Sequence, residues 1–345
     1  MKAMHLKKLG TLSSNPSPLE LGDLPTPELA QGEILVRVTA CGVCRTELDE
    51  VEGRLPPTRL PIVPGHQIVG VVDALGPSGF EERGGLLAGQ RVGIAWIYSA
   101  CGRCEFCRAG LENLCPEFKA TGCDVDGGYA QLVVVPAAFA HPLPDSLSDL
   151  DAAPLLCAGA IGYRAVRLSQ IGEGQILGLM GFGASGHLVL KMLHHRYPTL
   201  SVFVFSRMAE QIEFARALGA SWAGEISQPP PAKMDAVIDT TPAWLPVIQA
   251  LQGLKPGGRL IINAIRKEPD DRALLANLDY SAHLWLEREV KSVANITRSD
   301  VREFLALAAE AGLKPDVTCF DLDAANDALM WMKRGGHTGA GVLVI

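Results

Sequence analysis

Four cysteines within a run of fifteen residues constrain the fold of this chain more than any other feature of its sequence. They are Cys101, Cys104, Cys107 and Cys115, spaced C-x2-C-x2-C-x7-C. This spacing lets a short lobe fold back on itself, so that four thiolate sulfurs can meet one Zn²⁺ ion. A zinc ion with four thiolate ligands has no open coordination position. The cluster therefore predicts a structural zinc site, and we expect the chemistry to lie elsewhere in the chain.

Two other interpretations of the cluster fit the sequence less well. A ferredoxin-type iron–sulfur run has three residues before its final Cys-Pro, whereas seven residues precede Cys115-Pro116 here. Disulfides would need an oxidising compartment, but the cysteine count of nine is odd, and no apolar stretch follows the basic start of residues 1–8 as in a secretory signal. We therefore favour zinc, and we expect a cytoplasmic protein.

The length and composition indicate a globular protein of two domains. A chain of 345 residues is long enough for two cores, and 48% hydrophobic with 20% charged residues excludes disorder. Apolar stretches such as residues 201–205 are too short to cross a bilayer, so we expect no membrane partner. The net charge of −7 argues against a nucleic-acid partner, because phosphate binding depends on clustered lysine and arginine.

The first half of the chain reads as β-rich. Residues 32–38, 68–72 and 130–135 are short runs rich in Val and Ile, and Gly and Pro separate them. A compact, largely antiparallel domain is the simplest interpretation.

From about residue 154 the pattern changes to strands that alternate with helices. Such alternation is typical of a parallel sheet with crossover helices, here a doubly wound nucleotide-binding domain. The predicted strands are residues 175–180, 202–205, 235–239 and 259–263, and the predicted helices are residues 186–196 and 209–218.

The C-terminal part predicts two further helices and a strand. One helix is expected to begin with a capping box of Asp300 and Glu303 and to end at Gly312. The other should run from near residue 323 to residue 335. Residues 341–345 are strand-like and could return to complete the first domain.

A glycine-rich loop follows the first strand of the alternating half. It reads Gly181-Phe-Gly183-Ala184-Ser185-Gly186, and a helix is predicted directly behind it. Glycines permit a tight turn and a close approach of the backbone, while the helix N-terminus attracts a pyrophosphate. Strand, glycines and helix stand in the order that dinucleotide binding requires.

The end of the next strand indicates which dinucleotide binds. An NAD-selective site usually has an acidic residue there, but this chain has Ser206-Arg207. A hydroxyl and a guanidinium can bind a 2′-phosphate by charge-assisted hydrogen bonds, whereas a carboxylate would repel it. We therefore predict NADP(H) in preference to NAD(H).

Two further candidate metal ligands lie on glycine-flanked turns. Cys44 lies in the run CGVCRTE, and His66 lies in the run PGHQIVG. With the cysteine cluster and the GFGASG loop, these runs make four independent motifs in one order along essentially the whole chain. In this combination the chain resembles the zinc-dependent medium-chain alcohol dehydrogenases.

The resemblance implies a fold, a domain division and a second zinc ion. The fold is α/β: a GroES-like, largely antiparallel β catalytic domain of residues 1–155, completed by residues 292–345, and a Rossmann doubly wound domain of residues 156–291. It also implies that Cys44, His66 and Cys157 hold a catalytic zinc whose fourth position is open. The expected content is two zinc ions per chain.

The resemblance further implies roles for three residues that follow Cys44. Glu47 would orient the ligating histidine, a task for which the family usually has Asp. Thr46 would pass the proton from the alcohol oxygen, because a hydroxyl can donate and accept. Arg45 would pair with the cofactor pyrophosphate.

Two positions depart from the family pattern near the metal. Asp49 stands where many members have the histidine that ends the proton relay, so either Asp49 or solvent must take the proton. Gln67 stands where an acidic residue is common, which removes a negative charge from beside the zinc.

The implied function is reversible hydride transfer between an alcohol and NAD(P)⁺, giving an aldehyde or ketone. Trp96 would line the alcohol pocket, and Leu55 stands where a bulky Trp is common, which favours longer, branched or aromatic primary or secondary alcohols. An alternative is an NADPH-dependent aldehyde reductase. A different class would be an inactive, zinc-stabilised nucleotide-binding protein. The resemblance also implies a homo-oligomer, a dimer or a tetramer.

Overall fold

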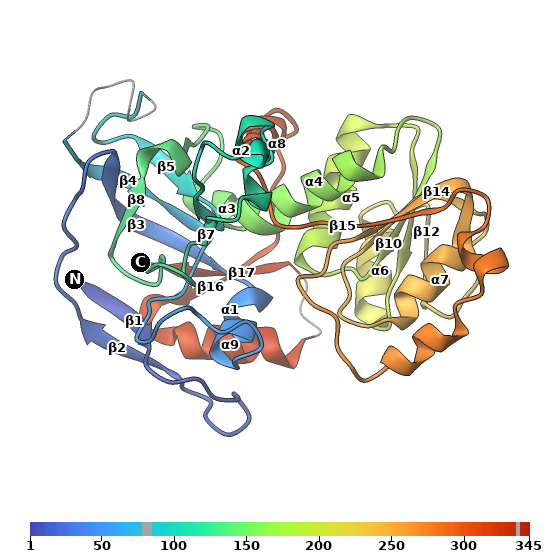
Figure 1. The fold of residues 1–345 in the computed structure, drawn as a ribbon, viewed down its shortest axis with the longest axis horizontal. Coiled ribbons are helices and arrows are strands. Elements are labelled where there is room, and N and C mark those ends of the chain that lie inside the picture. Colours follow the sequence, from blue (N-terminus) through green and yellow to red (C-terminus); the bar gives the residue numbers. More distant parts are fainter. Residues whose placement is uncertain (78–84, 336–338) are drawn as a thin grey trace. The chain divides into compact units, whose positions relative to one another are not determined.

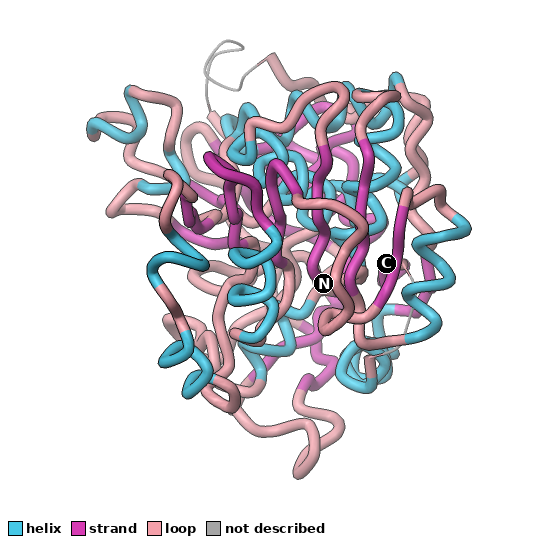
Figure 2. Tube along the Cα trace, turned by 90° about the vertical axis from the view of Figure 1, so that its right-hand side faces the viewer, coloured by secondary structure: helices cyan, strands magenta, loops and turns pink. Residues whose placement is uncertain are grey.

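The computed structural model describes residues 1–77, 85–335 and 339–345, which form two compact units. The first unit comprises residues 1–160 and 295–345, and the second comprises residues 161–294. Both chain ends lie in the first unit, as the two views of Figures 1 and 2 show. No helix in the described residues is long and apolar enough to cross a membrane.

A seven-stranded sheet forms the centre of the first unit, with six strands in the order β16-β17-β3-β4-β5-β9 and β8 paired to β3. All of these pairs are antiparallel except β16 with β17, so the predicted antiparallel β domain is confirmed. The C-terminal strand β17 pairs with β3, where Leu343 lies opposite Cys41. The bounds are β3 Glu33–Val43, β4 Ile68–Leu75, β5 Arg91–Ile94, β8 Leu132–Pro136, β9 Ala140–Pro142, β16 Val317–Asp321 and β17 Ala340–Val344.

The first unit also has two small antiparallel sheets and several helices. The small sheets pair β1 Lys2–Leu6 with β2 Leu19–Asp23, and β6 Ile97–Ser99 with β7 Lys119–Ala120. The α-helices are α1 Arg45–Val51, α2 Glu105–Arg108, α3 Asp149–Pro154, α8 Arg298–Glu310 and α9 Ala325–Arg334. Single turns of 3₁₀-helix cover Glu112–Leu114, Ala137–Phe139 and Leu322–Ala324, and a π-helical turn covers Leu155–Gly159.

The predicted capping box of α8 was wrong by one turn. The observed box joins Thr297, whose hydroxyl accepts the Asp300 N–H at 3.1 Å, to Asp300, whose carboxylate accepts the Thr297 N–H at 2.9 Å. Asp300 is therefore the third residue of the helix, because the hydroxyl three positions earlier already provides the cap.

The second unit is built on a six-stranded parallel sheet in the order β12-β11-β10-β13-β14-β15. The chain leaves β10 toward β11 on one side and later returns to β13 on the other, which is the doubly wound topology predicted from the sequence. The strands are β10 Ile176–Met180, β11 Ser201–Phe205, β12 Trp222–Gly224, β13 Met234–Asp239, β14 Leu254–Ile262 and β15 Glu289–Ser292. The helices are α4 Ala160–Ser169, α5 Ala184–Arg196, α6 Ala209–Ala217 and α7 Leu245–Gly253. A 3₁₀ segment covers Arg272–Asn277, and a π-helical turn covers Tyr280–Leu284.

The central strands of this sheet are buried on both faces. Leu177, Leu179, Val202, Val204 and Val237 are each 0% exposed. Side chains of this size each contribute about 2 kcal/mol when fully removed from water. This explains why the strands read as nearly continuous apolar runs.

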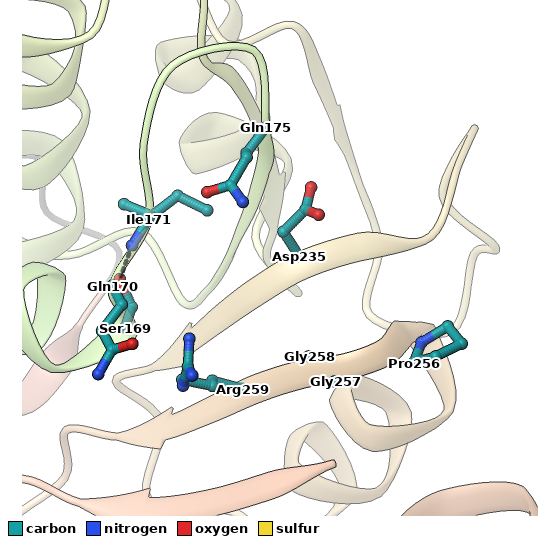
Figure 3. A pocket seen from close by; sticks show the side chains of 9 residues that line it. All are labelled: Ser169, Gln170, Ile171, Gln175, Asp235, Pro256, Gly257, Gly258 and Arg259. Atoms are coloured by element: carbon teal, nitrogen blue, oxygen red, sulfur yellow. Dashed lines mark hydrogen bonds between the residues drawn. The ribbon is translucent and has the colours of Figure 1, made fainter. Parts of the chain in front are cut away.

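A cavity of about 200 Å³ lies at the amino ends of these strands. Figure 3 shows Gln175, Asp235 and Arg259 on its wall. The Asp235 carboxylate accepts the Ile176 N–H and the Lys255 ammonium, both at 2.8 Å. Dinucleotides bind outside the opposite, carboxyl ends of such strands, so this cavity is not a candidate for the cofactor site.

Candidate metal centres and cofactor loop

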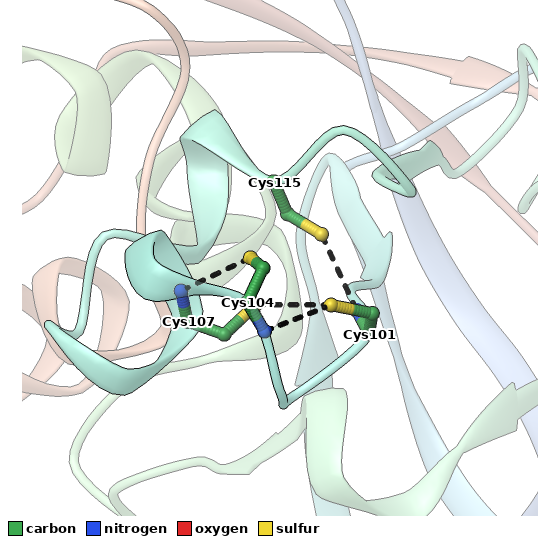
Figure 4. A group of neighbouring side chains, drawn as sticks. All are labelled: Cys101, Cys104, Cys107 and Cys115. Carbon is green, nitrogen blue, oxygen red and sulfur yellow. Dashed lines mark hydrogen bonds between the residues drawn. The ribbon is translucent and has the colours of Figure 1, made fainter.

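The four predicted ligands of the structural zinc lie together. The sulfur atoms of Cys101, Cys104, Cys107 and Cys115 all lie within 4.8 Å of one another, and Figure 4 shows these four side chains grouped around one centre. The turn after Cys104 is the short helix α2, and the Cys104 sulfur caps it by accepting the Cys107 N–H at 3.5 Å. All nine cysteines, every one in a described stretch, carry free thiols, so no disulfide competes for these sulfurs.

Backbone N–H groups in this lobe stabilise negatively charged sulfur. The Cys104 N–H donates to the Cys101 sulfur at 3.4 Å, and the amides of Arg103 and Cys104 lower the pKa of the Cys101 thiol to about 6. The Cys115 sulfur accepts the N–H groups of Cys101 at 3.4 Å and of Glu117 at 3.3 Å. Four converging sulfurs, three of which accept backbone N–H groups, fit a tetrahedral zinc ion, although burial and the neighbouring thiols raise the pKa of the Cys107 thiol to about 12.

The three predicted ligands of the catalytic zinc also lie together. Cys44 is the N-cap residue of α1, His66 lies just before β4, and Cys157 lies in the π-helical turn after α3. One ligand atom from each of the three residues lies within 4.8 Å of the others. All three belong to the first unit.

Tight packing fixes the turn that carries His66. Gly65 has φ +99°, and a Cβ atom there would lie 2.4 Å from Cδ1 of the buried Tyr129 ring. Only glycine fits this position, because any side chain would meet both the backbone strain and the ring. His66 is 1% exposed, and its ring packs edge-on against Trp96 with the ring centroids 4.8 Å apart.

Glu47 contacts the ring of this histidine. His66 Nδ1 lies 2.5 Å from Glu47 Oε1, and the other carboxylate oxygen of Glu47 accepts the Cys44 N–H at 2.8 Å. The remaining ring nitrogen, Nε2, is buried and has no hydrogen-bond partner among the described residues. A buried nitrogen beside two thiols, with its ring held by a carboxylate, fits a metal ligand.

The charges of these groups are strongly coupled. Contact with Cys157 and with His66 lowers the pKa of the Cys44 thiol well below its usual range, while contact with Cys44 and burial raise the pKa of the Cys157 thiol. Burial alone would lower the pKa of His66, but Glu47 and Cys44 outweigh burial and raise it. Cys44, His66 and Cys157 would hold a divalent cation, which would stabilise both thiolates and the neutral histidine.

Other predicted residues of this region lie on or near α1. The Thr46 hydroxyl is 3.5 Å from the Cys44 sulfur, and Arg45 is exposed at the first helical position. Asp49 is 0% exposed, and its carboxylate accepts the Arg54 Nε–H at 2.6 Å. The Leu55 N–H donates to the Asp49 carbonyl at 3.0 Å.

An ion network behind α1 was missed by the sequence analysis. Glu52 accepts the Lys333 ammonium at 2.7 Å and the Leu12 N–H at 2.9 Å, and it also pairs with Arg54. Despite the opposing effect of burial, these contacts lower the pKa of Glu52 to about 2. The signal in the sequence was four carboxylates between residues 47 and 52, which need cations from elsewhere when their helix is buried.

The glycine loop of the second unit has the geometry predicted for a dinucleotide. Gly181 directly follows β10 and has φ +89°, and a Cβ atom on Gly186 would lie 2.9 Å from the Gly181 carbonyl oxygen. Gly183 is the N-cap of α5, and no atom lies within 4 Å of the place where its Cβ would be. The helix begins at Ala184 and includes Ser185, two residues earlier than predicted. This open N-terminus of a 13-residue helix fits a pyrophosphate.

The residues predicted to select the cofactor lie at the carboxyl end of β11. Ser206 is 3% exposed; its hydroxyl donates to the Gln211 side-chain oxygen at 2.7 Å and accepts the Met208 N–H at 3.1 Å. Arg207 is exposed. The hydroxyl is therefore engaged within the protein, and the guanidinium is the group of this pair that faces solvent.

Two candidate metal sites and a dinucleotide loop in one chain fit a metal- and nicotinamide-dependent oxidoreductase. The model of the alcohol dehydrogenase GroES-like domain family matches residues 30–145. The chain is also 40% identical to the Mycobacterium tuberculosis (strain CDC 1551 / Oshkosh) protein named "Probable alcohol dehydrogenase AdhA", over 100% of this chain and 97% of that protein.

Solved structures agree with this relationship. An NAD-dependent alcohol dehydrogenase has a TM-score of 0.86 and 25% identity, over 100% of both chains. A protein of Sinorhizobium meliloti 1021, solved with NADP bound, has a TM-score of 0.87 and 25% identity, over 100% of this chain and 99% of that one. The chain belongs to the zinc-dependent medium-chain alcohol dehydrogenases, and it is an alcohol dehydrogenase that uses zinc and a nicotinamide cofactor.

Proposed function

We propose that this enzyme interconverts primary or secondary alcohols and their aldehydes or ketones, with NADP(H) preferred over NAD(H). The grouping of Cys44, His66 and Cys157 supports the reaction, and the Ser206-Arg207 pair supports the cofactor. The catalytic domain is proposed to be residues 1–155 with 292–345, and the cofactor domain residues 156–291; the two compact units divide slightly later, after residue 160, which keeps Cys157 in the same unit as Cys44 and His66.

The cofactor preference depends chiefly on Arg207. Its exposed guanidinium can form charge-assisted hydrogen bonds with a 2′-phosphate, while the neighbouring Ser206 hydroxyl is engaged by Gln211 and Met208. Related structures occur with either cofactor: one is named NAD-dependent and another holds NADP. The residue at this strand end is therefore the most direct guide to the choice.

Two zinc ions per chain are proposed. Cys101, Cys104, Cys107 and Cys115 would hold the structural ion, and Cys44, His66 and Cys157 the catalytic one. When bound at the second site, zinc supplies Lewis-acid chemistry that favours loss of the alcohol proton.

Residues of α1 would handle the proton and the cofactor. Thr46 is proposed to receive the alcohol proton, because its hydroxyl lies beside Cys44 and can donate and accept at once. Glu47 holds His66 in place. Arg45, exposed at the start of α1, is proposed to pair with the pyrophosphate. Asp49 is a candidate for the end of the relay, but Arg54 already occupies one of its carboxylate oxygens, so solvent is the favoured acceptor.

Two residues are proposed to shape the alcohol pocket. Trp96 packs on His66, which places an aromatic ring beside the metal ligands. Leu55 directly follows Arg54, and its side chain would leave more room in the alcohol pocket than a tryptophan. Longer, branched or aromatic alcohols should therefore be better substrates than ethanol.

The proposal is tested by steady-state rates with a panel of alcohols and aldehydes, each with NAD(H) and NADP(H). Higher kcat/KM with NADP⁺ and with larger alcohols supports it. Equal or higher values with NAD⁺ and ethanol would contradict it, and much faster reduction than oxidation would favour the aldehyde-reductase alternative. Catalysis with neither class of substrate would favour the nucleotide-binding alternative.

We also propose a homo-oligomer, with the edge of the second unit's sheet as the contact to a second copy. The edge strand β15 ends the sheet order, and Val290 within it is 48% exposed. The preceding residues Tyr280, Trp285 and Leu286 are 62%, 55% and 48% exposed. An apolar surface beside an unpaired strand edge is typical of an interface.

The nine free thiols favour a reducing compartment, so the cytoplasm is the proposed location.

A further inference from the structure

Lys267 is a buried cation whose three ammonium donors are all used. Its side chain is 9% exposed, and the ammonium donates to the carboxylate of Asp239, which is 0% exposed. It also donates to the carbonyl oxygens of Thr241 at 2.9 Å and Ala243 at 2.8 Å. Lys267 follows β14, whereas its three acceptors lie at the end of β13 and in the loop beyond it. The lysine therefore ties together the loops that follow two adjacent strands.

The tied loop packs directly on the glycine loop. A Cβ atom on Gly181 would lie 2.7 Å from Thr240 Oγ1 and 3.1 Å from Thr241 Cγ2. The Thr240 N–H and hydroxyl both donate to the Met180 carbonyl, at 2.9 and 3.0 Å. Thr240 and Thr241 thus form the wall against which the first glycine turns.

This wall lies at the switch point of the sheet. Asp239 is the last residue of β13 and lies opposite Met180, the last residue of β10. The crevice outside the carboxyl ends at a switch point is where doubly wound sheets bind dinucleotides. The position of residues 240–244 therefore helps to set the shape of the cofactor crevice.

We propose that Lys267 is a positioning residue for the nicotinamide dinucleotide. It acts through the loop and does not touch the cofactor. Its ion pair with Asp239 and its two carbonyl contacts hold residues 240–244 against Gly181, so that the glycine loop keeps the geometry that receives the pyrophosphate. A buried ion pair is weak evidence for stability alone, because desolvation offsets much of the attraction. We therefore expect Lys267 to act on the geometry of residues 240–244 more than on the overall stability of the fold.

The test uses a double variant, because Lys267→Met alone would leave Asp239 buried and unpaired. Lys267→Met with Asp239→Asn removes both charges, and the asparagine can still accept the Thr241 N–H. Fluorescence titration with NADPH and with NADH measures the dissociation constants. The double variant is expected to bind both about tenfold more weakly, which corresponds to about 1.4 kcal/mol. A loss shared by both cofactors separates this effect from that of Arg207, which should act on NADPH alone.

A second lysine–aspartate pair, at the amino end of β14, offers a control. Lys255 pairs at 2.8 Å with Asp235, which lines the cavity of Figure 3, away from the carboxyl edge of the sheet. Lys255→Met should leave both dissociation constants within about twofold of wild type, and Lys267→Arg, which keeps the charge, should lose less affinity than the double variant. A folded double variant with wild-type affinity would overturn the proposal. An equal loss in Lys255→Met would also overturn it, because the effect would then be one of general stability.

Discussion

Arg54 Nε lies 2.6 Å from Asp49 Oδ1, so a guanidinium already occupies one oxygen of the buried carboxylate at the position where many family members have a relay histidine. We therefore expect the proton to pass from Thr46 to solvent and not to Asp49. Asp49→Asn is therefore expected to lower kcat by no more than about threefold, whereas Thr46→Ala should lower it by about 100-fold or more. Steady-state rates of alcohol oxidation, measured for both variants and the wild type at one pH, test this. If Asp49→Asn fell as far as Thr46→Ala, Asp49 would be the acceptor.

Glu47→Gln should weaken zinc binding at Cys44, His66 and Cys157 while leaving the cysteine lobe loaded. The carboxylate fixes the ring of His66 through Nδ1, and loss of such a partner typically costs about 10- to 100-fold in metal affinity. Competition with a chelator, followed by metal analysis, would show one zinc ion leaving earlier than in the wild type. Glu47→Asp, the residue usual in the family, is the control and should retain more affinity than Glu47→Gln. Unchanged chelator resistance in Glu47→Gln would remove the orienting role.

Cys104→Ala should destabilise the protein before it affects the chemical step. Its sulfur is one of four in the lobe and also caps α2, so the variant should lose the structural zinc and unfold at a lower temperature. Cys319→Ala is the control, because Cys319 is exposed in β16 and belongs to neither cluster. Thermal unfolding with zinc analysis decides the matter: a Cys104→Ala protein as stable as Cys319→Ala would show that the lobe needs no metal.

His141 should make the enzyme sensitive to mild acid. Burial, together with the nearby Arg302 and Arg298, lowers the pKa of this histidine to about 3, although Glu112 acts in the opposite direction. The unfolded chain binds a proton near pH 6.5, whereas the folded chain does not, so the stability is fully present above that pH and is lost as pH falls toward 3. The expected loss from this residue between pH 7.5 and 5 is about 2 kcal/mol.

The comparison of wild type with His141→Gln isolates that effect from any loss of zinc in acid. Urea unfolding at about pH 7.5 and about pH 5 gives the free energy of unfolding of each protein. This free energy should depend less on pH in the variant than in the wild type, whatever the absolute stability of the variant. The same slope in both proteins would mean that the histidine is protonated in the folded state or is not buried there.

Most ligands of the two candidate metal sites were predictable from the sequence, because they stand in short runs with fixed spacing. Cys101, Cys104, Cys107 and Cys115 lie within one lobe, and neighbouring glycines mark the turns that carry Cys44 and His66. Cys157 needed the family resemblance, since nothing near it in the sequence marks a ligand. The parallel strands were predictable for another reason: strands buried on both faces are continuous apolar runs.

The ion pairs were beyond sequence reasoning, because each joins residues that only the fold brings together. Glu52 pairs with Lys333, which lies 281 residues away in the sequence, and Asp239 pairs with Lys267, which lies 28 residues away. Nothing in a single sequence indicates which distant cation a buried carboxylate will contact. The predicted capping box of α8 was wrong for another reason. The sequence contains two overlapping candidate boxes, Thr297 with Asp300 and Asp300 with Glu303, and in the structure the Thr297 hydroxyl caps the helix.

The zinc content of wild type and of Cys157→Ser, measured together with alcohol-dependent reduction of NADP⁺, tests the central claim most directly. We predict about two zinc ions per chain in the wild type, and in the variant one zinc ion, a near-wild-type unfolding temperature and no detectable alcohol oxidation. A Cys157→Ser protein that kept both zinc ions, or that still oxidised alcohols at the wild-type rate, would contradict the assignment of Cys44, His66 and Cys157 as the catalytic metal site.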